Sequence, residues 1–181
     1  MNEHAKPHIP PLIAGQSAES HRVLPGRANA GLVLLCDHAE NTLPPEYGTL
    51  GLPPSELQRH IAFDIGAAAV VEELSHLLGV PAVLTRFSRL LIDPNRGLDD
   101  PTLVMRLSDG AIIPGNRHLD ATERERRIER WYRPYHTAVD AVIDAAHAHH
   151  PHPALLSVHS FTEVWRGEIA VGDSLLLVSR N

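Results

Sequence analysis

A chain of 181 residues, of which 43% are apolar, is long enough for one domain to bury a core and too short for two ordinary domains. The formal net charge of −6 is spread along the chain without a basic cluster, which argues against a nucleic-acid partner and an anionic membrane surface. We therefore expect a small-molecule function.

Residues 1–28 contain several prolines and glycines, which predicts a flexible N-terminal arm ahead of one α/β domain over residues 29–181. They hold no apolar segment typical of a signal peptide, and no later segment reaches the roughly 18 uncharged apolar residues of a membrane helix. The single cysteine, Cys36, favours a buried thiol in a reducing compartment, with a catalytic nucleophile as the alternative. We expect a cytoplasmic protein.

The first half of the domain alternates between strand and helix patterns. Residues 31–36 form a continuous apolar run, typical of a strand buried on both faces. A short helix is predicted over 55–60, and a longer one over 65–78, where Gly79 is placed to end it. Residues 81–85 and 89–93 then predict two further strands.

The second half begins with residues 94–119, which show no regular pattern and which we interpret as an active-site loop. Asp120 can cap a long helix over 121–149, where Pro134 predicts a kink or a division. Residues 153–158 predict another strand, and a last apolar run follows at 175–178.

This alternation predicts a largely parallel sheet with helices on both faces. In such sheets ligands bind outside the carboxyl ends of the strands. Polar residues gather where the predicted strands end, and His38 and His159 each follow a strand directly. If those strands are neighbours, the two imidazoles share one crevice and can bind a zinc ion.

A zinc ion that activates water needs a third protein ligand and an open position. The acidic candidates are Asp37, Glu40 and Asp64, and their spacing does not choose among them. Asp64 has an alternative interpretation, as a carboxylate that caps the helix predicted over 65–78.

Asn95 and Arg96 close the segment predicted as a strand over 89–93, and Arg89 lies near them in sequence. Arginine commonly holds a substrate carboxylate through two hydrogen bonds, so this group is a candidate substrate site. The alternative is a set of solvated arginines paired with neighbouring aspartates.

Two further groups of residues each allow a functional and a structural interpretation. The histidine-rich segment 147–152 can be a metal site by composition, but its position after a helix and among prolines favours an exposed turn. Tyr135 and His136, on the long predicted helix, can line the cleft or pack in the core.

A series of motifs in chain order resembles the N-formylglutamate amidohydrolase family. Each motif alone is weak, but together they are specific and cover about residues 31–166. They are CDHAEN at 36–41, FDIGA at 63–67, SRLLIDPNR at 88–96, PGN at 114–116, YRPYH at 132–136 and VHSF at 158–161.

The resemblance implies a fold like that of the zinc carboxypeptidase and aspartoacylase superfamily, also called phosphorylase/hydrolase-like, with one catalytic Zn²⁺. It makes His38 and His159 metal ligands. Where the wider superfamily has a glutamate ligand this chain has Asn41, so Asp64 is the preferred third ligand. Asn95 and Arg96, helped by Arg89, would bind the carboxylate of an acidic N-acyl amino acid.

The implied reaction, a step of amino-acid metabolism, is metal-dependent hydrolysis of a linear amide, such as N-formylglutamate to formate and glutamate. Family members continue beyond the point where this chain stops, and the general base is expected in that later region. Glu163, and similarly Glu168, is a weak substitute. We therefore expect a C-terminally shortened domain, with a weakly active or non-catalytic protein that binds metal or an acidic metabolite as the alternative. Association into a homo-oligomer stays open.

Overall fold

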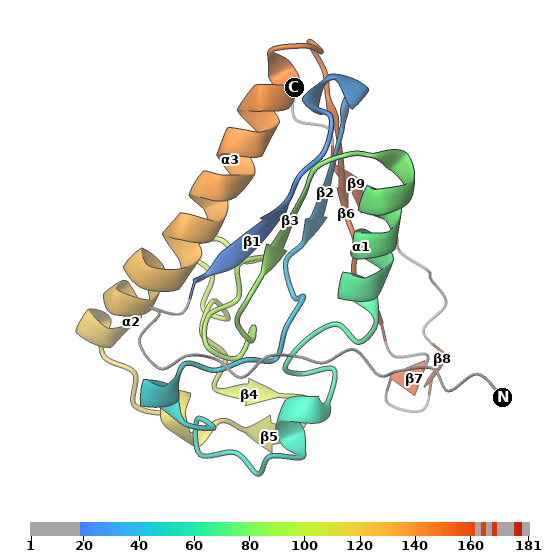
Figure 1. The fold of residues 1–181 in the computed structure, drawn as a ribbon. Helices are drawn as coiled ribbons and strands as arrows, with labels where there is room; N and C mark the ends of the chain where they lie inside the picture. Colours follow the sequence, from blue (N-terminus) through green and yellow to red (C-terminus); the bar gives the residue numbers. More distant parts are fainter. Residues whose placement is uncertain (1–18, 162–163, 166–167, 170–175, 179–181) are drawn as a thin grey trace, which may run out of the picture.

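The computed structural model describes residues 19–161, 164–165, 168–169 and 176–178 (Figure 1). Its centre is a five-stranded sheet in the order β1-β3-β2-β6-β9. The strands are β1 (His21–Leu24), β2 (Leu32–Cys36), β3 (Ala82–Thr85), β6 (Ala154–Ser157) and β9 (Leu176–Val178).

The three central strands, β3, β2 and β6, run parallel, and the two outer strands, β1 and β9, are antiparallel to their neighbours. This arrangement confirms the prediction of a largely parallel sheet, and the two antiparallel edge strands make the sheet mixed. β1 lies within the segment that we assigned to a flexible arm, and it pairs with β3 from His21 opposite Thr85 to Leu24 opposite Ala82. Four residues are too few for an apolar alternation to stand out among the surrounding prolines and glycines.

Two helices cover opposite faces of the sheet, α1 (Ala67–Leu78) and α3 (Arg133–His147) (Figure 1). Successive side chains of a strand point to opposite faces, so β2 supplies both layers of the core. Leu34 packs in the layer that contains Val71 of α1, and Val33 packs in the layer that contains Val139 of α3. Burial on both faces explains why β2 and β3 are apolar without alternation.

The helix predicted over 65–78 begins two residues later than expected, after Gly66, and ends as predicted at Gly79. The helix predicted over 55–60 is a 3-10 turn only, Glu56–Gln58. Over the described residues, no helix combines the length and the apolar composition that crossing a membrane requires. The other 3-10 turns are Ala28–Ala30, Pro45–Tyr47 and Pro114–Asn116.

The long predicted helix is divided, as Pro134 indicated. α2 (Ala121–Arg127) begins at Asp120, whose side chain accepts a hydrogen bond from the backbone N–H of Glu123. A π-helical turn (Ile128–Tyr132) then leads into α3, and the N–H of Arg133 donates to the carbonyl of Ile128, five residues earlier. Proline lacks an N–H and crowds the carbonyl four residues before it, which accounts for this local widening.

The prediction of a strand over 89–93 is wrong. These residues form a turn, in which the N–H of Leu91 donates to the carbonyl of Ser88. Leu90 and Ile92 are fully buried, but in loop clusters beyond the sheet. A short apolar run shows that a segment is buried and does not distinguish a strand from a buried turn.

The segments that follow β2 and β3 gather below the carboxyl ends of these strands in Figure 1. The loop over 94–119 is largely irregular, as predicted, and holds a small hairpin of β4 (Leu107–Ser108) and β5 (Ala111–Ile112). A second hairpin pairs β7 (Val164–Trp165) with β8 (Glu168–Ile169).

Candidate metal centre

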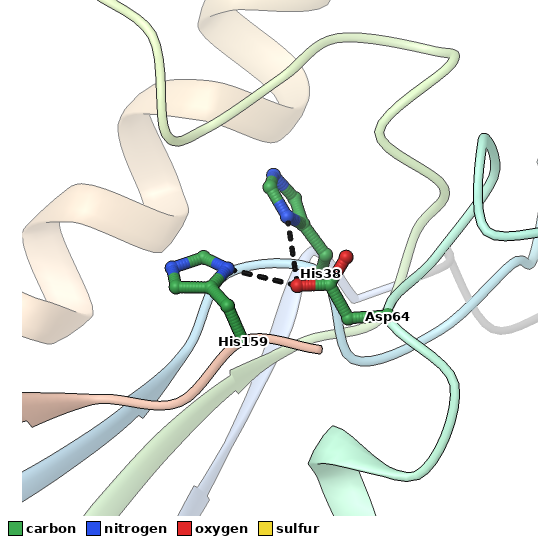
Figure 2. A group of neighbouring side chains, drawn as sticks. All are labelled: His38, Asp64 and His159. Atoms are coloured by element: carbon green, nitrogen blue, oxygen red, sulfur yellow. Dashed lines mark hydrogen bonds and ion pairs between the residues drawn. The ribbon is translucent and has the colours of Figure 1, made fainter. Parts of the chain in front are cut away.

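His38, Asp64 and His159 meet at the carboxyl ends of the parallel strands (Figure 2). His38 follows β2 and His159 follows β6, and these strands are paired, with Leu35 opposite Ser157. The two imidazole centroids are therefore only 5.2 Å apart, although 120 intervening residues separate them in sequence.

One oxygen of Asp64 lies between the two imidazoles. Its Oδ2 is 2.8 Å from Nδ1 of His159 and 3.4 Å from Nδ1 of His38 (Figure 2). Each of the three residues offers one ligand atom, and these atoms lie within 4.8 Å of one another. The cap of α1 is Gly66, without a side-chain hydrogen bond, so the Asp64 carboxylate faces the histidines and does not cap the helix.

The outer nitrogen of each imidazole faces an oxygen acceptor. Nε2 of His38 is 2.7 Å from Oδ1 of Asp93. Nε2 of His159 is 3.1 Å from Oγ of Ser157 and 3.4 Å from Oδ2 of Asp37. Metal-binding histidines commonly donate their second N–H to a carboxylate, which fixes the ring and leaves the inner nitrogen free for the ion.

Asp37 is itself held by groups from two other elements. The hydroxyl of Tyr135, on α3, donates to its Oδ1 over 2.5 Å, and Ser157 donates to its Oδ2 over 2.7 Å. Burial alone would raise the pKa of Asp37, but hydrogen bonds from His159, Tyr135 and Ser157 outweigh burial and lower this pKa to about 2. Asp37 is therefore ionised at neutral pH.

Asp93 faces the outer nitrogen of His38, as Asp37 faces that of His159, and Asp93 is fully buried. Besides His38, it accepts a hydrogen bond from Nη2 of Arg89 at 2.8 Å and one from the backbone N–H of Asn95 at 2.9 Å. Arg89 also lies 3.6 Å from Oδ1 of Asp64. The guanidinium that we expected to help bind substrate thus contacts two carboxylates of the site.

The charges of this cluster favour a cation. Three carboxylates, Asp37, Asp64 and Asp93, surround the imidazoles, and Arg89 is the cation paired with two of them. With neutral imidazoles these groups carry two net negative charges, which two protons or one divalent ion would balance.

Without a metal, protons on the two imidazoles balance the negative charge of the carboxylates. Hydrogen bonds to Asp37 and Asp64 raise the pKa of His159 to about 9. Burial lowers the pKa of His38, but hydrogen bonds to Asp64 and Asp93 outweigh burial and raise it overall. The same contacts, against the opposing effect of burial, hold the pKa of Asp64 well below its usual range.

The donor set fits zinc. Two imidazole nitrogens and one carboxylate oxygen are the ligands of many catalytic zinc sites, which leave the fourth position to water or substrate. Among the described residues, this is the one group of three histidine, cysteine, aspartate or glutamate side chains that is placed to share an ion.

The other candidates from the sequence lie apart from this group. Glu40 contacts Thr42, and the amide of Asn41 donates to the carbonyl of Leu57. Cys36 is fully buried, and burial raises the pKa of its thiol to about 12, which argues against a catalytic thiolate. Glu163 lies outside the described residues.

Asn95 and Arg96 stand at the rim of the site. The side chain of Arg96 is 46% exposed, with its Nε 3.9 Å from Asp93 and its Nη1 3.9 Å from Asp100. Part of its charge is thus paired with neighbouring aspartates, as the alternative interpretation expected, but its exposure leaves donors accessible. The backbone of Asn95 is tied to Asp93, while its side chain is exposed and lines a cavity beside His159.

Two further residues of the site were missed in the sequence. Asp93 stands inside the SRLLIDPNR motif, next to the residues we singled out, and a carboxylate in that position was the available signal. Ser157 gives no comparable signal, because it lies within the apolar run predicted as a strand over 153–158.

The model of the N-formylglutamate amidohydrolase family matches residues 30–174. The chain belongs to this family. The match extends over every motif that carried the resemblance and includes His38, Asp64, Asp93 and His159.

Two solved structures share the fold of this N-formylglutamate amidohydrolase family member. The gene product Atu2144 from Agrobacterium tumefaciens is 36% identical, with a TM-score of 0.76 over 83% of this chain and 60% of that one. The N-formylglutamate amidohydrolase from Ralstonia eutropha JMP134 is 27% identical, with a TM-score of 0.66 over 78% of this chain and 57% of that one. The chain therefore spans less than two thirds of either structure, and no curated protein matches it.

Proposed function

We propose that this protein binds one zinc ion through His38, Asp64 and His159 and hydrolyses an N-formyl or other N-acyl amino acid, such as N-formylglutamate. The observation that carries the proposal is the convergence of both Nδ1 atoms on Asp64 while each Nε2 faces a second acceptor. Membership of an amidohydrolase family supports the reaction class.

A bound zinc ion would supply a Lewis acid and would lower the pKa of a coordinated water. The protein's own residues supply orientation. Asp93 and Asp37 hold the outer nitrogens of His38 and His159, so the inner nitrogens stay directed at the ion. Arg96 and Asn95, at the rim, would bind the substrate carboxylate and place the amide over the metal.

A second function, binding of a metal or an acidic metabolite without hydrolysis, is favoured by one observation. The three carboxylates that contact the imidazoles are already occupied, Asp37 and Asp93 by hydrogen bonds and Asp64 by the two histidines. A general base must be free to take a proton, so none of the three suits that role.

We also propose that the protein belongs to the zinc carboxypeptidase-like superfamily, as the sequence resemblance implies. A cytoplasmic location is part of the same proposal. The mixed sheet and the position of the metal ligands beyond its carboxyl ends support the superfamily placement.

Metal analysis combined with an amidase assay tests the proposal. The purified chain should hold one zinc per molecule and release formate from N-formylglutamate. His38→Ala and His159→Ala should each lose stoichiometric zinc, whereas His76→Ala, on the far part of α1, should retain it. Full zinc content in both site variants would refute the ligand assignment, and zinc binding without formate release would support the binding protein.

A further inference from the structure

A cavity of about 180 Å³ lies between the candidate metal centre and α3. His159 and Asp37 of the metal centre form part of its wall, and Asn95 of the rim lines it as well. A substrate whose amide lies at the metal and whose carboxylate lies at Asn95 would therefore have a third group next to this cavity.

The polar atoms in the wall of the cavity are largely occupied by one another. Both oxygens of Asp37 accept hydrogen bonds, from Tyr135 and Ser157. Nε2 of His136 is 3.1 Å from the carbonyl oxygen of Pro94. Apart from the exposed amide of Asn95, the cavity thus offers few donors to a polar guest, and Asp37 would repel an anionic one.

The remaining wall is aliphatic and no cationic side chain other than histidine lines the cavity within the described residues. Leu35, Val139, Ile143 and Leu155 come from β2, α3 and β6. A cavity of ~150 Å³ with such a lining is known to hold a benzene molecule. The space beside His159 is therefore of the size and chemistry to hold one phenyl or branched aliphatic group.

We infer that this cavity is a specificity pocket for an apolar group of the substrate, about the size of a phenyl ring. The inference rests on the proposed function and narrows its substrate class. A glutamate side chain would place its carboxylate against aliphatic walls and Asp37, so it does not suit the cavity. The apolar group can be carried on the acyl side or on the amino-acid side, because the cavity adjoins both the metal centre and the rim.

Binding measurements with four compounds test the pocket. The 181-residue chain, with one equivalent of Zn²⁺, is titrated calorimetrically with N-formylphenylalanine and N-formylglycine, and with N-benzoylglutamate and N-formylglutamate. Burying a phenyl group should make one apolar compound bind about tenfold or more tightly than its matched partner. The first pair reports an apolar group on the amino-acid side and the second pair one on the acyl side.

A substitution in the wall should remove that preference. Val139→Phe fills the cavity from α3, so the ratio of the two Kd values should fall to within about threefold of one. Val142→Phe is the matched control, because Val142 lies on the same helix but does not line the cavity, and it should keep the wild-type ratio. If Val139→Phe does not fold, Val139→Ala widens the pocket and should shift the preference at least about threefold toward the corresponding naphthyl compound.

The possible results distinguish failure of the pocket from failure of the proposed function. No apolar preference in either pair, with N-formylglutamate still bound, overturns the pocket and leaves the proposed function intact. A preference that survives Val139→Phe, or does not shift in Val139→Ala, also overturns the pocket. Failure of all four compounds to bind overturns the proposed function and the pocket with it.

Discussion

Asp37 is not one of the proposed zinc ligands, but it should influence zinc affinity through His159. It accepts hydrogen bonds from Tyr135 and Ser157 and faces the outer nitrogen of His159. In Asp37→Asn the amide keeps the shape but loses the charge that orients and polarises the imidazole. Zinc affinity should fall about 10- to 100-fold, measured by competition with a chromogenic chelator.

Tyr135→Phe provides the matched comparison for Asp37→Asn. It removes one hydroxyl and keeps the ring, which is fully buried in the core layer between α3 and the sheet. Its effect on zinc affinity should have the same direction and be smaller, because Asp37 retains its charge and the hydrogen bond from Ser157. Unchanged zinc affinity in Asp37→Asn would contradict the positioning role.

Arg96 and Arg89 should differ in what their removal changes. Arg96 is nearly half exposed and its ion pairs are long, so Arg96→Ala should leave stability nearly unchanged and raise KM for an acidic substrate about tenfold or more. Arg89→Ala would remove the cation that contacts both Asp93 and Asp64 and should lower stability. Arg117→Ala, at an exposed site, is the control in steady-state kinetics and thermal unfolding, and an unchanged KM in Arg96→Ala would count against the carboxylate site.

At the scale of elements, the turn into α1 fixes Asp64. Gly66 has φ of 85° and ψ of −18°, a left-handed conformation that a Cβ makes unfavourable, although the space around it is open. Gly66→Ala should therefore cost about 1 to 2 kcal/mol in the free energy of unfolding through backbone strain alone. Gly66→Asn should cost less, because asparagine tolerates this region, and equal losses in urea unfolding would argue against the strain explanation.

Asn116 joins the loops that carry the rim residues. Its amide donates to the carbonyls of Leu90 and Met105, and its oxygen accepts from the buried guanidinium of Arg127. Asn116→Ala would leave these groups unpaired in the interior, so the free energy of unfolding should fall by about 3 kcal/mol. Asn95→Ala, at an exposed side chain in the same loop region, should change it by less than about 0.5 kcal/mol, and a comparable loss in both variants would refute this role.

The elements that the sequence predicted well are those with a strong local signal. β2, β3 and β6 are apolar runs, α1 has a clear apolar stripe and Gly79 at its end, and Pro134 marks the change of helix geometry. The strand predicted over 89–93 had the same apolar signal but packs as a turn in a loop cluster. That outcome depends on packing against Phe87 and Trp131. Trp131 is distant in sequence and Phe87 fits no strand or helix period, so neither contact gives a local pattern.

At the scale of the whole molecule, the candidate metal centre depends on the order of strands in the sheet. His38 and His159 were singled out because each follows a buried strand, but their contact requires β6 to lie beside β2. Sequence patterns do not give that order, and the family resemblance supplied the expectation. The roles of Asp37 and Ser157 depend on tertiary contacts, because Asp37 accepts hydrogen bonds from Tyr135 of α3 and from Ser157 of β6, and no local pattern indicates either contact.

The charge balance of the centre predicts opposite effects of pH with and without zinc. In the zinc-free protein, hydrogen bonds to Asp37 and Asp64 raise the pKa of His159 from 6.5 to about 9, so its imidazolium stabilises the fold. This contribution is complete below pH 6.5 and is lost as the pH rises through about 9. Zinc must displace that proton, and one on His38, whose pKa is also raised, so zinc affinity should increase with pH up to about 9.

Thermal unfolding measured with and without zinc from pH 6 to 8.5 checks this prediction. Free zinc at 100 times its Kd adds about 2.7 kcal/mol, which should raise the Tm of a chain of this size by roughly 5 to 10 °C. At a fixed zinc concentration the increase should grow with pH, because fewer protons remain to be displaced. His159→Ala should lose the zinc-dependent increase at every pH. An increase in Tm that is equal at pH 6 and pH 8, or larger at pH 6, would show that zinc does not replace the protons of these histidines.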